Sequence, residues 1–236
     1  MDFFISTKNR TDKEELMDDF SIGGDLLRDT LDKLENINRW LGGNLMTVRA
    51  LKKVLKNHPK EQELTIADIG CGHGDILRDV AKFGRKNGYK MKLIGMDANP
   101  TAIAYANELS SEFSELSFKT EDIFSEAFKN RKFDVVLATL FLHHFKEEQL
   151  TSFLGNTLKQ TKIGIVVNDL HRHKLAYYLF MLLSVFIKNN MIIEDGLTSV
   201  LRGFKRNELM HISNKLKVKP QISWKWAFRF QWILKY

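Results

Sequence analysis

The chain alternates between two spacings of apolar residues, one typical of short buried strands and the other of helices with one apolar face. Short apolar runs predict strands at residues 64–69, 91–96, 116–120, 133–138 and 163–168. Helical spacing predicts helices near residues 75–87, 100–112, 146–160 and 171–189. Because strands that alternate with helices form parallel sheets covered on both faces, we expect an α/β fold with a doubly wound, mostly parallel sheet.

The two ends of the chain depart from this alternation. Residues 23–57 carry apolar residues at helical spacing, and Gly42-Gly43 interrupts them, so two helices are expected there. After a helix near 205–215, the aromatic-rich runs "VKPQISW" and "FRFQWIL" predict an antiparallel C-terminal pair at the sheet edge. We therefore predict an N-terminal helical cap at residues 1–58 and an α/β domain at residues 59–236.

Composition limits the class of protein. With 236 residues, 44% hydrophobic and 28% charged, the chain is typical of a globular protein. The single cysteine, Cys71, excludes an internal disulfide and fits a reducing compartment. The start of the chain turns acidic after a few apolar residues, unlike a signal peptide. The longest apolar run, 175–187, is shorter than the about 20 residues that span a bilayer. We expect a cytoplasmic protein.

The positive charge is concentrated in one segment. From residue 201 onward the chain has nine Lys or Arg residues and one acid, which exceeds the net charge of +7 of the whole chain. This excess predicts either an anionic partner, such as a membrane surface, or lysines that protect strand edges and solvate helices. We favour the second interpretation and leave peripheral membrane contact open.

A glycine-rich stretch, "TIADIGCGHGDILRDV", joins the first predicted strand to the first helix. Open parallel sheets bind ligands at such strand ends. A dinucleotide fingerprint needs glycine at residue 75, where this chain has Asp75, and a carboxylate at a helix N-terminus repels a pyrophosphate. No Gly-Lys-Ser/Thr follows, which excludes a triphosphate-binding loop. The loop suits an adenosyl group without phosphates.

Four motifs in order resemble those of the class I S-adenosylmethionine-dependent methyltransferases, over roughly residues 60–170. "ADIGCGHGDI" is similar to motif I of that family, an acidic residue followed by three spaced glycines. "KLIGMDANP" ends its strand in Asp97, the position at which the family binds the ribose hydroxyls. "TEDIF" places Asp122 and Ile123 where the family holds the adenine. "FDVVLATLFLHHF" resembles the strand and loop that face the methyl group.

The resemblance implies a Rossmann-like fold and S-adenosyl-L-methionine as the cofactor. The implied cofactor-binding residues are Asp68, Gly70, Cys71, Gly72, Gly74, Asp97, Ala98, Asp122, Ile123 and Thr139. The chemistry agrees, because Asp68 suits the ammonium group of the ligand and Asp97 suits two ribose hydroxyls. Each residue taken alone could instead form an ordinary turn at a strand end. Cys71 is expected to fill the loop rather than to act as a nucleophile.

Histidines follow the strand whose loop resembles the one that faces the methyl group. An oxygen or carbon acceptor loses a proton during methylation, so a base with a near-neutral pKa is useful there. His143 and His144 are the candidates; neighbours on a turn point apart, and we favour His144. "NDLHRH" adds Asp169 and His171 as supporting residues. The alternatives are histidines that bond backbone groups and a helix cap formed by Asp169.

Two related classes are disfavoured by the same region. The metal-dependent catechol-type methyltransferases carry an aspartate at the end of the fourth strand, where this chain has Ala138-Thr139, so no metal is expected. Methyltransferases that act on the amino groups of adenine or cytosine carry Asp/Asn-Pro-Pro-aromatic after that strand, and "ATLFLHH" lacks this motif. A nucleic-acid partner is therefore not expected.

The "LHHF" loop is similar to that of the ubiquinone- and menaquinone-biosynthesis methyltransferases and their small-molecule relatives. We therefore predict O-methylation of a small phenolic or quinol-type acceptor. The apolar segment 175–187 could be core, line an apolar acceptor pocket, or contact a second copy in a homodimer. The alternatives are an RNA or protein methyltransferase, suggested by the basic C-terminal segment, and a protein that binds S-adenosylmethionine without catalysis.

Overall fold

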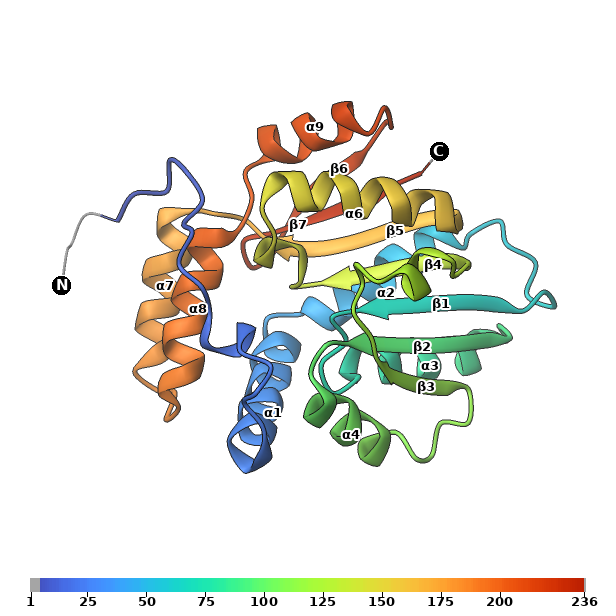
Figure 1. Ribbon diagram of the computed structural model, residues 1–236, viewed down its shortest axis with the longest axis horizontal. Coiled ribbons are helices and arrows are strands. Elements are labelled where there is room, and N and C mark those ends of the chain that lie inside the picture. Colours follow the sequence, from blue (N-terminus) through green and yellow to red (C-terminus); the bar gives the residue numbers. More distant parts are fainter. Residues whose placement is uncertain (1–4, 236) are drawn as a thin grey trace.

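A computed structural model describes residues 5–235, so residues 1–4 and 236, the outer ends of the two predicted domains, lie outside it. Its centre is a seven-stranded sheet in the order β3-β2-β1-β4-β5-β7-β6 (Figure 1). The strands are β1 (Leu64–Ile69), β2 (Met91–Asp97), β3 (Leu116–Thr120), β4 (Phe133–Thr139), β5 (Thr161–Leu170), β6 (Gln221–Lys225) and β7 (Arg229–Leu234). The predicted α/β fold with a mostly parallel sheet is confirmed.

The strand order reverses between β1 and β4, which lie side by side and parallel, with Ile66 opposite Val135. In open sheets of this kind a crevice forms outside the carboxyl ends of the strands at that point. The predicted antiparallel pair at the edge is also confirmed: β7 runs antiparallel to both β5 and β6, and β6 is the outermost strand.

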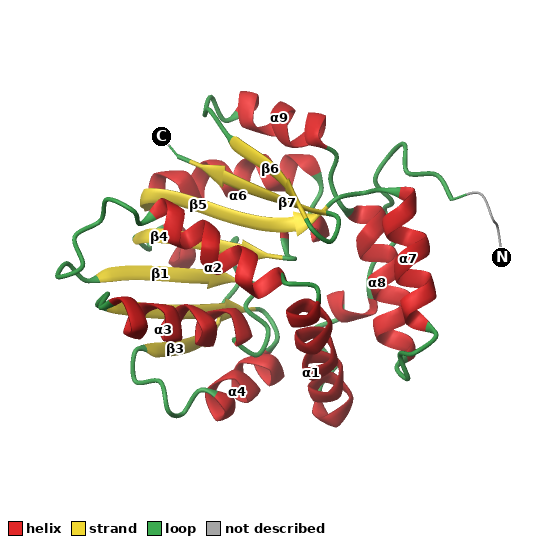
Figure 2. Cartoon of the chain, turned by 180° about the vertical axis from the view of Figure 1, so that it is seen from behind, coloured by secondary structure: helices red, strands yellow, loops and turns green. Residues whose placement is uncertain are grey.

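Helices cover both faces of the sheet. The helices are α1 (Gly24–Trp40), α2 (Gly43–Val54), α3 (Asp75–Asn87), α4 (Pro100–Leu109), α5 (Glu126–Lys129), α6 (Glu147–Gln160), α7 (Lys174–Ser184), α8 (Asn190–Arg202) and α9 (Arg206–Lys215). Two short 3-10 helices, η1 (Leu16–Asp18) and η2 (Leu142–His144), complete the elements of the described chain. Figure 2 shows α2 and α3 in front of the sheet, whereas α6 and α9 lie on the other face. The core therefore has two layers, one on each side.

The two predicted N-terminal helices are present, and they have different surroundings. Leu51 and Leu55, in α2 and just after it, are fully buried in the same cluster as Leu64 and Val135 of the sheet. The helix α1 lies instead beyond the carboxyl ends of the strands, beside α8 (Figure 1). The domain boundary at residue 58 stays a prediction.

The helix expected at 171–189 is present as α7, but it ends at Ser184, and a second helix, α8, begins at Asn190 and packs against it. The side chain of Asn189 accepts a hydrogen bond from the Ile192 N–H and so starts α8, which the sequence pattern missed. The apolar residues Leu182, Val185 and Phe186 at the end of α7 are exposed. No helix within residues 5–235 is long and apolar enough to cross a membrane.

Candidate functional site

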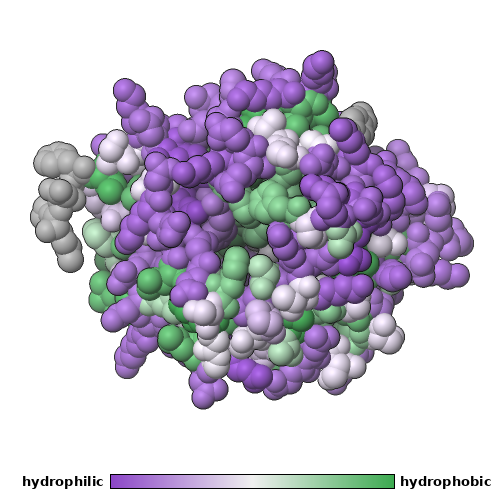
Figure 3. All heavy atoms as spheres, viewed as in Figure 1, coloured by the Kyte–Doolittle hydropathy of each residue, from purple (hydrophilic) through white to green (hydrophobic). Residues whose placement is uncertain are grey.

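A cavity of about 1430 Å³ lies at the carboxyl ends of the central strands. The loops that follow β1, β2, β3 and β4 line it, together with the N-terminal segment, α1 and α8. Figure 3 shows a hollow near the middle of one face, with apolar surface inside and hydrophilic residues around it. This is the crevice expected where the strand order reverses.

The glycine loop after β1 is held by backbone hydrogen bonds to the neighbouring strand. The N–H groups of Gly70 and Cys71 donate to the Met96 carbonyl, at 2.8 and 3.1 Å. The Gly72 N–H donates to Asp97 Oδ2 at 2.9 Å, and Asp97 Oδ1 accepts the Asn99 N–H at 2.9 Å. Asp97 therefore joins the ends of β1 and β2 and lies at the cavity wall.

Gly70 has a positive φ of 67°, and a Cβ at this position would collide with the Phe141 ring. Only glycine combines that conformation with so close a neighbour. Since Phe141 belongs to the loop after β4, this contact joins the glycine loop to the histidine loop.

The buried acids beside the loop fit a cationic ligand. Asp68 is 1% exposed, and its Oδ1 has no hydrogen-bond partner within residues 5–235. Burial, with the nearby charges of Asp75 and Asp97, raises the pKa of the Asp68 carboxyl well above its usual range. Burial also raises the pKa of Asp97, against the hydrogen bonds that its carboxylate accepts. An ammonium group would supply the missing partner of Asp68 and offset these costs.

Nine of the ten predicted cofactor residues line the cavity: Asp68, Gly70, Cys71, Gly72, Asp97, Ala98, Asp122, Ile123 and Thr139. Gly74 is the N-cap of α3 and is not among the lining residues of the described chain. Asp122 is exposed, and its Oδ1 accepts the Phe124 N–H at 2.8 Å. Burial, with the charges of Asp97 and Asp68, raises the pKa of the Cys71 thiol, which supports a packing role. The binding roles of all ten residues stay predictions.

His143 and Asp169 form a buried pair, with His143 Nδ1 2.7 Å from Asp169 Oδ1. Asp169 Oδ2 also accepts the N–H groups of Leu142 and His143, so one carboxylate positions the whole turn. Burial raises the pKa of Asp169, but the charge and hydrogen bond of His143 outweigh it, and the pKa lies below its usual value. An ionised carboxylate only accepts hydrogen bonds, so Nδ1 carries a proton and Nε2 is left as the basic atom.

His144 has a different partner. Its Nδ1 lies 2.7 Å from Asp18 Oδ1, in the N-terminal segment, and its ring centroid lies 4.3 Å from that of His143, with the two planes tilted by 31°. Burial raises the pKa of Asp18, but the hydrogen bond and charge of His144 outweigh it, and the pKa falls well below its usual range. The predicted support of His144 by Asp169 is therefore replaced by a bond to Asp18, and Asp169 holds His143 instead.

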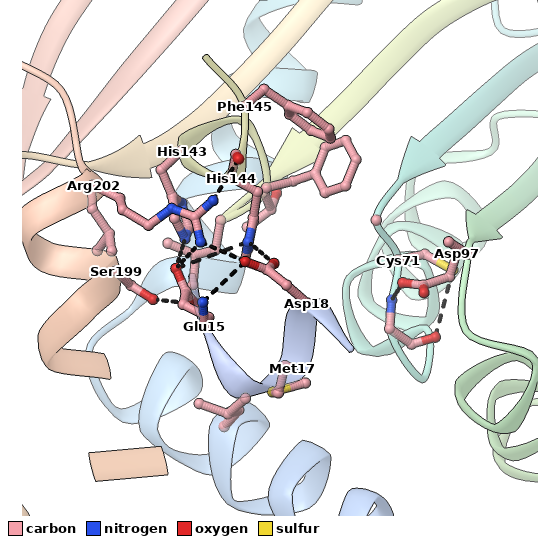
Figure 4. A pocket seen from close by; sticks show the side chains of 18 of the residues that line it. Glu15, Met17, Asp18, Cys71, Asp97, His143, His144, Phe145, Ser199 and Arg202 are labelled. Atoms are coloured by element: carbon pink, nitrogen blue, oxygen red, sulfur yellow. Dashed lines mark hydrogen bonds and ion pairs between the residues drawn. The ribbon is translucent and has the colours of Figure 1, made fainter. Parts of the chain in front are cut away.

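The acidic stretch "EELMDD" closes one side of the cavity. Glu15 Oε1 lies 3.6 Å from His143 Nε2, and Ser199 donates a hydrogen bond to Glu15 Oε2 at 2.7 Å. Arg202 pairs with Asp18 at 2.6 Å. Figure 4 shows this group facing the cavity opposite Asp97 and Cys71. Burial raises the pKa of Glu15, against the charge of His144 and the Ser199 hydrogen bond.

Sequence reasoning missed these partners. The only signal available was the acidic character of the start of the chain, which carries no contact information. Glu15, His143 and His144 each offer a ligand atom within 4.8 Å of the others, and such a group could hold a metal ion. In the structure, Ser199 donates to Glu15 Oε2, while Asp18 and Asp169 bind the Nδ1 atoms of His144 and His143. The expectation that no metal is used stays a prediction.

His171 is placed away from the cavity. It is not among the lining residues of the described chain, and the Trp224 Nε1–H donates to its Nδ1 at 3.2 Å. Burial, with the positive charge of His173, lowers the pKa of His171 to about 4. A histidine that is neutral and turned toward Trp224 cannot support a base at His143 or His144, and we remove it from the candidate set.

Known proteins resemble the α/β part of this chain. A sequence profile described as a methyltransferase domain matches residues 60–189. The ubiquinone biosynthesis O-methyltransferase of Rickettsia canadensis is 28% identical over 141 residues, 58% of this chain and 56% of that protein. The carboxy-S-adenosyl-L-methionine synthase of Nitratiruptor sp. is 29% identical over 117 residues, 49% of this chain and 46% of that protein. The chain spans about half the length of these curated relatives.

Solved structures share the fold over most of the chain. The plantazolicin methyltransferase BpumL, in complex with SAH, superposes with a TM-score of 0.65 and 18% identity, and the match covers 89% of this chain and 88% of that chain. An O-methyltransferase family protein from Burkholderia thailandensis has a TM-score of 0.65 and 12% identity, with 94% of this chain and 62% of that chain covered. At such low identities the likeness concerns the fold.

Proposed function

This chain belongs to the family of methyltransferase domains, in the class I S-adenosylmethionine-dependent fold, and we propose that it methylates a hydroxyl of a small aromatic acceptor. The observation that carries the acceptor class is the buried His143–Asp169 pair at the cavity wall, with Nδ1 and Oδ1 2.7 Å apart. A nitrogen acceptor brings its own lone pair, whereas a hydroxyl must lose a proton. A base held by a carboxylate therefore favours the hydroxyl.

The cofactor residues fit the proposed methyl donor. S-adenosylmethionine supplies a methyl group on a sulfonium, which becomes a neutral thioether when the acceptor oxygen takes the methyl. Asp68, with its free Oδ1, would bind the ammonium group, and Asp97 would accept the ribose hydroxyls. Asp122 and Ile123 would lie beside the adenine, as the motif resemblance implies.

The residues after β4 would handle the acceptor. His143 Nε2 would accept the hydroxyl proton, and Asp169 would stabilise the imidazolium that forms. His144, bonded to Asp18, would hold the N-terminal segment over the acceptor and so limit the access of water. We therefore propose His143 as the base in place of His144.

The names of the relatives support an oxygen acceptor, since several are ubiquinone biosynthesis O-methyltransferases. The basic C-terminal segment, which suggested RNA, is partly used inside the protein. Arg202 pairs with Asp18, and Arg206 donates to the Ile222 carbonyl at 2.9 Å. These contacts reduce the charge available to an anionic polymer.

The test is a transfer assay with the purified chain, S-adenosylmethionine and a panel of phenols, quinols, lipids and RNA. We expect S-adenosylhomocysteine to form with phenols or quinols, and mass spectrometry to find an O-methyl ether. Methylation of RNA or of a nitrogen atom would contradict the acceptor class. Calorimetry that detects no binding of S-adenosylhomocysteine would overturn the cofactor assignment as well.

A further inference from the structure

Arg229, the first residue of β7, is buried without a partner at two of its donors. Its side chain lines the cavity, and the residue is 3% exposed. Within residues 5–235, its Nε and Nη1 atoms have no hydrogen-bond partner. Other arginines at the cavity differ: Arg10 donates from all three nitrogens to backbone carbonyls, and Arg202 pairs with Asp18. Arg229 therefore stands out as a cation with unused donors.

Such an arrangement is costly in the free protein. Removing a guanidinium from water is unfavourable unless an anion or hydrogen-bond acceptors compensate. Burial lowers the pKa of Arg229 to about 10, opposed by the charge of Asp169. The side chain still carries its charge at neutral pH. A ligand anion in the cavity would compensate this cost, and the planar fork of a guanidinium matches a carboxylate.

The position of Arg229 points to the acceptor rather than to the cofactor. In the sheet Arg229 lies opposite Leu170, and the two side chains share a face, whereas Asp169, one residue earlier, points to the other face. The charge of Asp169, which holds the proposed base His143, still acts on the guanidinium at this end of the strands. The strand β7 is the third strand from β1 in the order β1-β4-β5-β7. At a spacing of about 4.8 Å between strands, the two strands are roughly 14 Å apart. Asp68 lies near the end of β1 and the glycine loop follows that strand, three strands away from Arg229 in the sheet.

The junction of α1 and α2 closes over the guanidinium. A Cβ at Gly43 would lie 2.5 Å from Arg229 Nη1 and would collide with Asn38 Oδ1, another buried atom without a partner in the described chain. Asn168 donates to the Gly43 carbonyl at 3.0 Å and fixes this wall. The guanidinium is thus held in a narrow, polar end of the cavity rather than free to reach solvent.

We propose that Arg229 is the anion-binding residue of the acceptor site, and that the acceptor is a phenol that also carries a carboxylate. The carboxylate pairs with Arg229 and remains ionised, while the hydroxyl faces His143. The inference rests on the proposed methyltransferase function and adds to it the chemical class of the acceptor. The inference predicts that the enzyme prefers phenolic acids to their methyl esters, a preference that a site for the hydroxyl alone would not produce.

The experiment compares phenolic acids with their methyl esters as acceptors, in the wild type and in Arg229→Met. We expect the wild type to favour the free acid by about 10- to 100-fold in kcat/KM, the range of a hydrogen-bonded charge. The variant should lose this preference and keep its activity on the esters. Arg229→Lys, which keeps the positive charge but not the planar pair of guanidinium donors, should retain part of the preference for the free acid. Arg85→Met, at an exposed arginine of α3 paired with Glu115, is the matched control and should behave as wild type.

Calorimetry in the presence of S-adenosylhomocysteine separates this inference from the proposed function. Binding of the acid that Arg229→Met abolishes, without turnover, would support the anion site and contradict the function. Equal binding or turnover of acid and ester by the wild type would overturn the anion site. A weaker affinity of Arg229→Met for S-adenosylhomocysteine, with the acceptor preference unchanged, would assign the guanidinium to the cofactor and also overturn it.

Thermal stability provides the remaining readout. Replacing an uncompensated buried charge with an apolar side chain is expected to leave Tm of the ligand-free protein unchanged or to raise it. Addition of a phenolic acid should raise Tm of the wild type more than that of Arg229→Met. A marked loss of Tm in ligand-free Arg229→Met would show that Arg229 is a structural residue and would contradict the proposal.

Discussion

Around the glycine loop, on the proposed cofactor side of the cavity, backbone N–H groups donate to Met96 and Asp97 of β2. Around His143 and His144, on the proposed acceptor side, side chains from several elements pair with one another. Gly72 and Asp97, which join β1 to β2, are 25 residues apart. His144 and Asp18 are 126 residues apart, and Arg202 and Asp18 are 184 apart. The contacts of the glycine loop thus come from a neighbouring strand, whereas the contacts of Asp18 form only when the N-terminal segment packs against α8 and the loop after β4.

This difference has a functional consequence. Hydrogen bonds between neighbouring strands form with the sheet and tolerate changes elsewhere, so the cofactor side can be kept while acceptors vary. The proposed acceptor side consists of side chains on separate elements, and each of them can be substituted without a change in the backbone of the sheet. Substitutions there are expected to change catalysis or acceptor choice without loss of cofactor binding, and the following variants test this separation.

The largest effect is expected for His143→Ala. Removal of the proposed base should lower kcat by about 100- to 10,000-fold, while the affinity for S-adenosylhomocysteine is unchanged. Initial rates and calorimetry measure the two quantities. His211→Ala, at an exposed histidine of α9, is the matched control and should keep full activity. If His144→Ala lost more activity than His143→Ala, the assignment of the base would be reversed.

Asp97→Ala is expected to weaken cofactor binding rather than to change catalysis. Loss of the acceptor for the ribose hydroxyls, and of the bonds from Gly72 and Asn99, should weaken S-adenosylhomocysteine binding by about 10- to 100-fold. At saturating cofactor, kcat should remain within a few-fold of wild type. Glu61→Ala, at an exposed loop position, serves as the control. A large fall in kcat at saturation would show that the two sides are not separable.

Asp122→Ala should have a smaller effect on the same side. The residue is exposed, and its carboxylate already accepts the Phe124 N–H, so its bond to the adenine would add little. We expect a two- to tenfold loss of cofactor affinity by calorimetry, and no change in acceptor preference. A loss as large as that of Asp97→Ala would contradict this ranking of the two acids.

The smallest effect concerns the contact between α1 and the glycine loop. His73 Nε2 lies 3.0 Å from Glu35 Oε2, and this pairing, against a cost from burial, lowers the pKa of Glu35 to about 2. Because the folded-state pKa is depressed, this stabilisation is present above the usual value near 4.5 and is lost as the pH falls toward 2.

Glu35→Gln should therefore lower Tm at pH 7 by about 2–4 °C and should have little effect near pH 2. Thermal unfolding followed by circular dichroism between pH 2 and pH 7 measures the difference. Glu61→Gln, at an exposed position of the loop before β1, should show no such dependence on pH. An equal loss of Tm at both pH values would show that Glu35 stabilises the fold by packing.

The sequence alone predicted the sheet and the residues that line the proposed cofactor side of the cavity. Strand runs such as 116–120 and the helix at 75–87 agree with the structure to the residue, because period-two and helical spacing are local properties. The glycine loop was identified for a similar reason: Gly70 needs a positive φ and lies directly after its strand. Asp68 and Asp97 end adjacent strands, so their convergence follows from the parallel sheet.

Only the tertiary structure decided the acceptor side. The shared carboxyl edge of the predicted strands favoured Asp169 as support for His144, whereas the folded chain gives Asp169 to His143 and Asp18 to His144. In the sequence, Arg229 is only one of the basic residues of the C-terminal segment. The structure shows that its Nε and Nη1 atoms are buried without a hydrogen-bond partner in the described chain. These pairings depend on how α8, β7 and the N-terminal segment pack around the strand ends. No local pattern encodes the bonds of Asp18, because its partners His144 and Arg202 lie 126 and 184 residues away. His143 and Asp169 are only 26 residues apart, but which of two adjacent histidines takes the carboxylate depends on the fold of the turn.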